Sequence, residues 1–226
     1  MPRIIDLTLP LENGLRGVSI EPAKRLERDG WNATTLHLYS HSGTHMDAPT
    51  HFGVSDQTID RIPLDQCMGP AWVVDPVGIS VACSSGQGEG VHGTPYERVL
   101  IRVADLGQTA DKMRRGDGLL LRTGWSRYVD NPSYRAQLPR VSLELAQWCV
   151  AKGVRMLGVE PPSVADVNNL EELTAVHKIL LRAGIVIVEG LANLDQIRRE
   201  KVTFMAFPLK VVGGDGAPVR AFAVEE

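Results

Sequence analysis

Three histidines and one aspartate lie within eleven residues near the start of the chain: His41, His45, Asp47 and His51, in the run SHSGTHMDAPTH. The chain contains six histidines in total, so half of them gather in this one segment. Imidazole and carboxylate groups are ligands that zinc and manganese accept. The segment therefore predicts a site for a divalent metal ion.

The spacing within this segment favours a loop over a helix. His41 and His45 are four residues apart, and on a helix they would share one face, as in zinc sites of the HExxH type. Gly43 lies between them, however, and Pro49 disfavours helix at the residue before it. We expect a loop that follows a strand, with Asp47 beside the two histidines. Two imidazoles and one carboxylate leave positions open on the ion, which is typical of a catalytic site rather than a structural one.

His51 completes the segment and has a different expected role. If its ring stays off the metal, it can accept and donate protons, because the ordinary pKa of histidine lies close to neutral pH. The alternative is that one or more of the four residues only caps or packs against local structure.

A second pair of candidate ligands lies much later in the chain. His177 falls in a predicted helix over residues 170–182, and Glu189 directly follows a predicted strand over 185–188. The turn at Gly184 brings the strand end back toward the helix. A buried carboxylate is costly unless it is paired or binds a metal. The alternative interpretation pairs Glu189 with Arg182 and leaves His177 on the solvated face of the helix.

The remaining pattern predicts a mixed α/β fold in a single domain over residues 1–226. The first half is rich in strands, and the second half alternates helix and strand. Residues 83–93 are rich in glycine and are expected to form a mobile loop. The expected strands are 3–9, 34–41, 71–75, 118–123, 155–159, 185–188, 204–212 and 217–223, and the expected helices are 22–28, 105–115, 142–152 and 170–182.

Composition narrows the classes of function. The 226 residues are 43% apolar and carry a net charge of −3, so a full core is expected and a nucleic-acid partner is not. No run approaches the roughly 18 apolar residues of a membrane span, and we expect no signal peptide. The three cysteines Cys67, Cys83 and Cys149 are widely spaced and odd in number. They favour reduced thiols and a cytoplasmic protein over a disulfide framework.

The pattern His-x-Gly-Thr-His-x-Asp-x-Pro-x-His, intact from His41 to His51, resembles the signature of the cyclase-like metal-dependent hydrolases. Bacterial kynurenine formamidase and isatin hydrolase belong to that family. Three later blocks resemble the family in the same order: residues 121–125 (LRTGW), 158–164 (GVEPPSV) and 187–194 (IVEGLANL). The resemblance covers most of the chain, from about residue 6 to residue 212.

The resemblance implies a fold of the swivelling β/β/α type and a homodimer or homotetramer. It implies His41, His45 and Asp47 as metal ligands and His51 as the acid/base. In the formamidases a second metal is held by the histidine and glutamate that match His177 and Glu189. The isatin-type members work with a single manganese ion. One or two zinc or manganese ions per chain are therefore expected.

The function that this resemblance implies is hydrolysis of a carbon–nitrogen amide bond in a small molecule, as in an arylformamidase. Phe52 and Trp125 are the aromatic residues expected at the substrate. One segment departs from the formamidase pattern: residues 12–18 (ENGLRGV) stand where those enzymes carry a Trp-Pro-Gly-Asp-type segment. Two alternatives therefore stay open, a hydrolase of a cyclic amide, imide or lactone, and a non-catalytic metal-binding oligomer.

Overall fold

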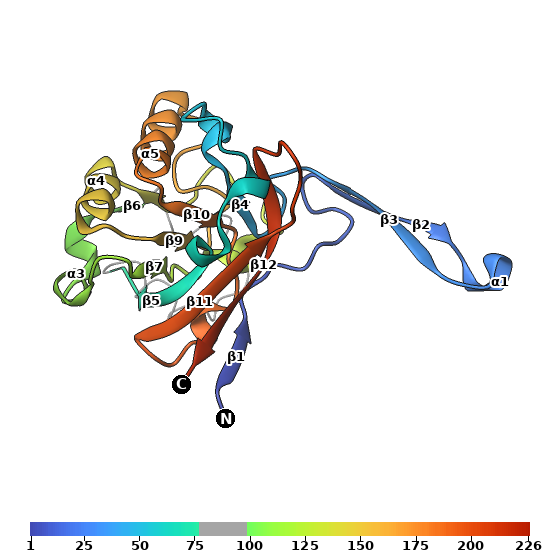
Figure 1. The fold of residues 1–226 in the computed structure, drawn as a ribbon, viewed down its shortest axis with the longest axis horizontal. Helices are drawn as coiled ribbons and strands as arrows, with labels where there is room; N and C mark the ends of the chain where they lie inside the picture. Colours follow the sequence, from blue (N-terminus) through green and yellow to red (C-terminus); the bar gives the residue numbers. More distant parts are fainter. Residues whose placement is uncertain (77–98) are drawn as a thin grey trace.

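A closed sheet forms the centre of the molecule in the computed structural model, which describes residues 1–76 and 99–226 (Figure 1). The predicted loop at 83–93 and Cys83 lie outside the described residues. The strands of the main sheet follow the order β1-β12-β11-β5-β7-β9-β10-β4. Their bounds are β1 Arg3–Asp6, β4 His45–Asp47, β5 Met68–Val74, β7 Gly118–Leu121, β9 Met156–Val159, β10 Val186–Glu189, β11 Lys201–Pro208 and β12 Gly216–Glu225.

The sheet closes on itself because β12 pairs with β4 as well as with β11. Strands β5, β7, β9 and β10 run parallel, and the remaining pairings are antiparallel. A short parallel pair, β6 Leu100–Ile101 and β8 Arg140–Val141, lies outside this sheet. The mixed α/β class predicted from the sequence is confirmed.

The parallel strands β7, β9 and β10 are buried on both faces. In β7, Leu120 points into the interior of the closed sheet, whereas Leu119 and Leu121 pack on the outer face with residues of the helices. Successive side chains of a strand point to opposite faces, so a continuous apolar run is what two buried faces require. The outer face is covered by α4 Leu143–Lys152 and α5 Leu170–Arg182 (Figure 1).

Both long helices begin and end where the sequence predicts. The side chain of Ser142 accepts a hydrogen bond from the amide of Leu145 at the start of α4, and Gly153 ends that helix in the left-handed conformation. Asn169 caps α5 in the same way. Cys149, on α4, and Cys67 are both free and buried. Among the described residues, no helix is long and apolar enough to cross a membrane.

Two predicted helices are wrong. In place of a helix over 105–115, the chain forms a short 3-10 turn at Val103–Leu106 and then α3 Thr109–Lys112. Gly107 separates them with a φ of 53°, which a continuous helix does not allow. In place of a helix over 22–28, residues Val18–Lys24 form β2, and only α1 Leu26–Asp29 is helical.

Strands β2 and β3 (Ala33–Leu38) form an antiparallel hairpin that extends away from the rest of the molecule, with α1 at its tip (Figure 1). We call residues 18–38 the arm. Large apolar side chains on it are exposed: Leu26 at 56%, Trp31 at 57% and Leu36 at 55%.

Candidate metal centre

The short strand β4 positions the first candidate ligands. His45 and Asp47 are two residues apart on this strand, so both side chains lie on one face, while Met46 points into the interior of the closed sheet. The sequence placed His45 in a loop, and that prediction is wrong. Three residues are too few for an alternating pattern to show, and the pairing partners that hold β4 in the sheet lie far along the chain.

Pairing with both neighbours brings the later candidates to β4. His45 lies opposite Glu189 in the antiparallel register with β10, and Asp47 lies opposite Gly216 in the register with β12. Glu189 is the last residue of β10 and is buried. His177 comes from α5, which packs over the same face. All five predicted ligands therefore meet on the outer face of the sheet.

The ligand atoms form two groups that share Asp47. In the first group, Oδ1 of Asp47 lies 3.0 Å from Nδ1 of His41 and 3.8 Å from Nε2 of His45. In the second group, Oδ2 of Asp47 lies 3.6 Å from Nε2 of His177. Glu189 completes the second group, with Oε1 at 3.3 Å from the same nitrogen of His177. The ligand atoms of each group lie within 4.8 Å of one another.

Each of the three candidate histidines turns one ring nitrogen toward the carboxylates and uses the other elsewhere. Nδ1 of His45 lies 3.0 Å from the carbonyl oxygen of Gly43, and Nδ1 of His177 lies 2.7 Å from that of Leu173. Nε2 of His41 lies 3.0 Å from Asp215. When these outer nitrogens donate their protons, the inner nitrogens keep free lone pairs. This is the usual arrangement of histidines that bind metals.

The chemistry of the group also fits a divalent ion. Oδ2 of Asp47 is buried and has no hydrogen-bond partner among the described residues. A buried carboxylate oxygen without a partner is costly, and a cation between Asp47, His177 and Glu189 would remove that cost. Distances of 3.0–3.8 Å between ligand atoms match those between atoms that each lie about 2.0–2.2 Å from one ion.

The charges of the cluster are strongly coupled. Burial disfavours the charged form of His41, but hydrogen bonds and charge from Asp47 and Asp215 raise its pKa to about 9. Burial likewise disfavours the charged form of Glu189, yet the bonds from His177 and His45 hold its pKa well below the ordinary value. Cations are therefore strongly favoured here, whether they are protons on the histidines or a metal ion.

His51 and Phe52 lie beside the cluster on a 3-10 turn over Pro49–Phe52. The ring of His51 packs against that of His41, with centroids 3.9 Å apart, and its Nδ1 lies 3.4 Å from Asp215. Burial lowers the pKa of His51, so its ring is neutral at neutral pH. Phe52 stacks on the ring of His177 at 4.4 Å.

Asp215 is a candidate functional residue that the sequence reasoning missed. Its Oδ2 atom lies 3.0 Å from Nε2 of His41 and 3.4 Å from Nδ1 of His51, and the three residues have possible ligand atoms within 4.8 Å of one another. The residue precedes β12, which pairs with β4, and it is therefore far from the histidine segment in sequence. The signal that could have found it is an acidic residue in a glycine-rich turn, Gly213-Gly214-Asp215-Gly216.

Residues of the sequence blocks 158–164 and 187–194 hold the cluster in position. The amide of Val164 donates a hydrogen bond of 2.7 Å to Oε1 of Glu189. Gly190, which has a φ of 68°, lies tightly against the backbone of Gly43, and its carbonyl accepts a 2.5 Å hydrogen bond from Thr44. The backbone of the histidine segment is thereby held against the loop that follows β10.

A cavity of about 310 Å³ opens onto the cluster, and its wall includes His41, His45, His51, Phe52, His177 and Glu189. The predicted Phe52 thus lines this cavity. Trp125 does not: its side chain is 0% exposed, packs in the core and donates a hydrogen bond to the carbonyl of Tyr134. Trp125 therefore does not line this cavity, unlike Phe52.

Comparison with known proteins identifies the family. Residues 5–166 match the Cyclase family, described as "Putative cyclase". A kynurenine formamidase of Salinibacter ruber is 32% identical over 190 residues, which is 84% of this chain and 78% of that protein. A kynurenine formamidase of Bacillus cereus is 27% identical over 224 residues, 96% of this chain and 95% of that protein.

Among solved structures, isatin hydrolase A from Ralstonia solanacearum superposes with a TM-score of 0.83 at 23% identity, over 100% of this chain and 92% of that chain. This likeness confirms the predicted fold. Together with the sequence match over most of the chain, it shows that the protein belongs to the cyclase family.

Proposed function

We propose that this protein is a metal-dependent hydrolase that cleaves the carbon–nitrogen amide bond of a small molecule, as an arylformamidase does. One observation carries the proposal: three buried or nearly buried histidines each turn one ring nitrogen toward the carboxylates of Asp47 and Glu189, beside an open cavity. The similarity to two kynurenine formamidases over most of the chain supports the choice of bond.

We assign two divalent ions per chain, zinc or manganese, and Asp47 would contribute ligand atoms to both. His41, His45 and Asp47 would hold one ion, and Asp47, His177 and Glu189 the other. Nitrogen and carboxylate oxygen ligands suit both metals. When bound, such ions lower the pKa of water and polarise a carbonyl group.

His51 is assigned as the acid/base. Its ring is only partly buried, it lines the cavity, and its lowered pKa leaves it neutral and ready to accept a proton from the attacking water. Returning that proton to the departing nitrogen matters for an amide, since an unprotonated amine anion leaves poorly. The carboxylate of Asp215, whose Oδ2 lies 3.4 Å from Nδ1 of His51, would stabilise the His51 ring while it is protonated.

Phe52 is assigned to the substrate. Its ring lines the cavity together with the apolar side chains of Val167 and Leu173. A cavity of about 310 Å³ is of the size that small aromatic ligands occupy. An aryl group would pack on these residues and exclude water from the amide bond. The same wall accepts a cyclic aryl amide, so ring opening remains the alternative reaction.

The test begins with elemental analysis of protein purified without chelator, followed by hydrolysis assays with N-formylkynurenine and isatin. Two ions per chain with formamide cleavage is the expected result. Cleavage of isatin alone would move the substrate to the cyclic class. Absence of bound metal, or metal without hydrolysis of any amide, lactone or ester in a broad panel, would contradict the proposal and favour the non-catalytic oligomer.

We also propose that the chain forms a homodimer or homotetramer through its arm. The exposed Leu26, Trp31 and Leu36 on a hairpin that extends from the body support this, because large apolar side chains on such a projection are usually covered by a partner. Light scattering should give a mass of two or four chains. A Trp31→Ser variant should dissociate more readily on dilution, and a wild-type monomer at micromolar concentration would contradict the assignment.

A cytoplasmic location completes the proposal. Two free, buried cysteines, Cys67 and Cys149, support it, because reduced thiols persist in that compartment. Cell fractionation should recover the protein with cytoplasmic markers, and recovery with an exported fraction would contradict this location.

A further inference from the structure

A buried carboxyl group that the proposed reaction does not use stands two residues before the wall of the metal cavity. Glu160 directly follows β9 and is 1% exposed, and Pro162 lines the cavity. Glu160 belongs to neither of the ligand groups that share Asp47. A buried carboxyl group is costly unless hydrogen bonds or a cation satisfy it, so its partners indicate what it holds in place.

The partners of Glu160 belong to the turn that follows β7. Its Oε2 accepts hydrogen bonds from the amide of Thr123 at 2.7 Å, from the hydroxyl of the same residue at 3.1 Å, and from the amide of Gly124. Its Oε1 accepts a 3.1 Å hydrogen bond from the hydroxyl of Ser126. Burial raises the pKa of Glu160, and these donors offset part of the rise. The side chain thus joins the end of β9 to the turn after β7.

The segment that follows Glu160 reaches a metal ligand. The amide of Val164 donates a 2.7 Å hydrogen bond to Oε1 of Glu189, and this oxygen lies 3.3 Å from Nε2 of His177. The two residues directly after Glu160 are prolines, whose rings fix φ, so the segment between Glu160 and Val164 is stiff. A displacement at Glu160 is therefore carried to the amide that orients Glu189.

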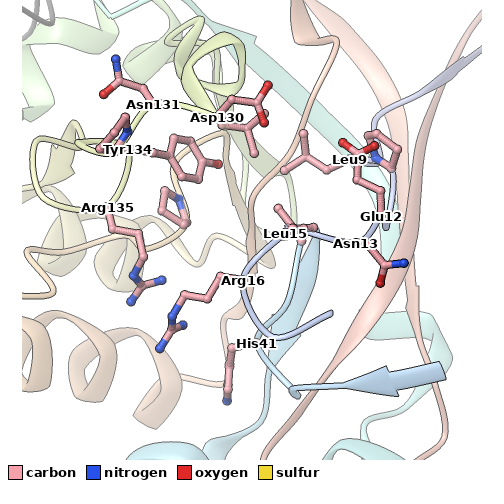
Figure 2. Close-up of a pocket in the computed structure, with 16 residues that line it drawn as sticks. Leu9, Glu12, Asn13, Leu15, Arg16, His41, Asp130, Asn131, Tyr134 and Arg135 are labelled. Carbon is pink, nitrogen blue, oxygen red and sulfur yellow. The ribbon is translucent and has the colours of Figure 1, made fainter. Parts of the chain in front are cut away.

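The same segment is also held at its beginning. The carbonyl of Pro161 accepts a 2.8 Å hydrogen bond from the amide of Gly190, the residue after the end of β10. The hydroxyl of Tyr134 donates a 3.2 Å hydrogen bond to the carbonyl of Glu160. Tyr134 and His41 both line a hollow of about 390 Å³ that adjoins the cluster (Figure 2). Backbone and side-chain contacts together therefore fix the position of Glu160 relative to the cluster.

We propose that Glu160 is a positioning residue for the second metal site, the group of Asp47, His177 and Glu189. Its carboxyl group, bound to the turn after β7, holds the segment that follows so that the amide of Val164 orients Glu189 for the ion. This inference rests on the proposed function and deepens it at the same site. Groups that orient a metal ligand contribute about 10- to 100-fold to metal affinity. We expect an effect of that size at the second site and a much smaller one at the first.

Two substitutions of Glu160 separate the reach of the side chain from its charge. Glu160→Asp keeps the charge but shortens the side chain by one methylene group, so its carboxylate no longer reaches the turn unless the segment shifts. Glu160→Gln keeps the length: its amide oxygen can accept the hydrogen bonds made to Oε2, and its NH₂ group can donate to the hydroxyl of Ser126. We expect Glu160→Asp to weaken the second site by about 10- to 100-fold and Glu160→Gln to stay within about threefold of the wild type.

Calorimetric titration of metal-free protein with Zn²⁺, together with elemental analysis, measures the affinity of each site. His41→Ala removes a ligand of the first site, so the second site is measured alone in that background. His177→Ala removes a ligand of the second site and leaves the first to be measured. Glu160→Asp should weaken binding in the His41→Ala background and change it by less than about threefold in the His177→Ala background. A general loss of stability would weaken both.

Glu225→Asp is the matched control, because Glu225 is also buried and also accepts hydrogen bonds from backbone amides. Glu225 ends β12, whereas Gly216, which pairs with Asp47, begins that strand. Glu225→Asp should leave both affinities within about twofold of the wild type. Should Glu160→Asp fail to fold, Ser126→Ala removes one donor to Glu160 and should weaken the second site alone by about three- to tenfold.

Equal weakening of both sites by Glu160→Asp would overturn the proposal, because Glu160 would then only stabilise the fold. Weaker binding in Glu160→Gln than in Glu160→Asp would also overturn it, since charge rather than reach would then matter. Unchanged binding in Glu160→Asp, or in Ser126→Ala where that variant replaces it, has the same consequence. Each of these results leaves the hydrolase assignment in place, because both wild-type sites still bind metal. A wild type that holds no ion at the second site would instead refute the two-ion assignment, and this inference with it.

Discussion

Replacing Asp47 by asparagine removes the one residue shared by both ligand groups. The side chain is 1% exposed, and its two oxygens face different histidines, Oδ1 toward His41 and Oδ2 toward His177. Asparagine keeps the volume of the side chain but has one carbonyl oxygen and one NH₂ group, and the NH₂ group does not bind cations. We therefore expect Asp47→Asn to bind at most one ion per chain tightly.

The size of the effect follows from the ligand count. Changing a residue that only orients a ligand costs about 10- to 100-fold in metal affinity. Asp47 is itself a ligand in this assignment, so the loss at the affected site should be at least about 100-fold, or about 2.8 kcal/mol. Asp47→Ala removes both oxygens and should weaken both sites.

Elemental analysis after dialysis against a metal buffer measures the number of ions bound per chain, and calorimetric titration measures their affinities. Asp195→Asn is the matched control, because Asp195 is 53% exposed and pairs with Arg127 on the surface. That variant should bind metal as the wild type does. If Asp47→Asn holds two ions with affinities within about twofold of the wild type, the shared-ligand arrangement is refuted.

Three further changes test other parts of the structure. His51→Ala should lower kcat by about 100- to 10,000-fold at full metal content, and near wild-type turnover would remove its acid/base role. Gly190→Ala places a methyl group against the backbone carbonyl of Gly43 at a positive φ, so urea unfolding should show the free energy of unfolding lowered by about 3 kcal/mol. Gly184→Ala, also at a positive φ but in open space, is the control and should lower it by only about 1 kcal/mol. Equal losses in the two variants would contradict the steric argument. Burial opposes ionisation of Asp117, but hydrogen bonds from a backbone amide and from Lys201 lower its pKa below 3.8. The stabilising contribution of the ionised Asp117 is therefore complete above pH 3.8 and is lost as the pH falls through the lower pKa of the folded state. Asp117→Asn should lower the free energy of unfolding in urea by about 1–3 kcal/mol at pH 7 and by progressively less below pH 3.8. A difference that stays constant with pH would contradict the assignment.

Local signals predicted the parts of the fold that local interactions determine. Helices α4 and α5 have capping residues and periodic apolar positions within the segment itself, and both were predicted with their ends. The buried parallel strands were also visible as short apolar runs. The false helix over 105–115 shows the limit, since one glycine at positive φ divides it.

The candidate site was predicted wherever the residue type alone carried the signal. Residue types and spacing predict the histidine segment as a metal site. For His177 and Glu189 the residues alone leave a structural alternative open, and the resemblance to the family implies their role as ligands. Asp215 was not predicted, because its place beside His41 depends on the pairing of β12 with β4, and no local pattern encodes that pairing.

The three-residue strand β4 joins β10 to β12 and thereby closes the sheet, and two of its three residues are candidate metal ligands. The closure of the sheet and the candidate metal centre therefore depend on the same three residues. Any ion held there binds the folded state and not the unfolded one, so mass action couples metal concentration to the folding equilibrium. A divalent ion bound at this strand would therefore stabilise the closure of the sheet, and its concentration would shift the folding equilibrium as well as the fraction of metal-loaded protein.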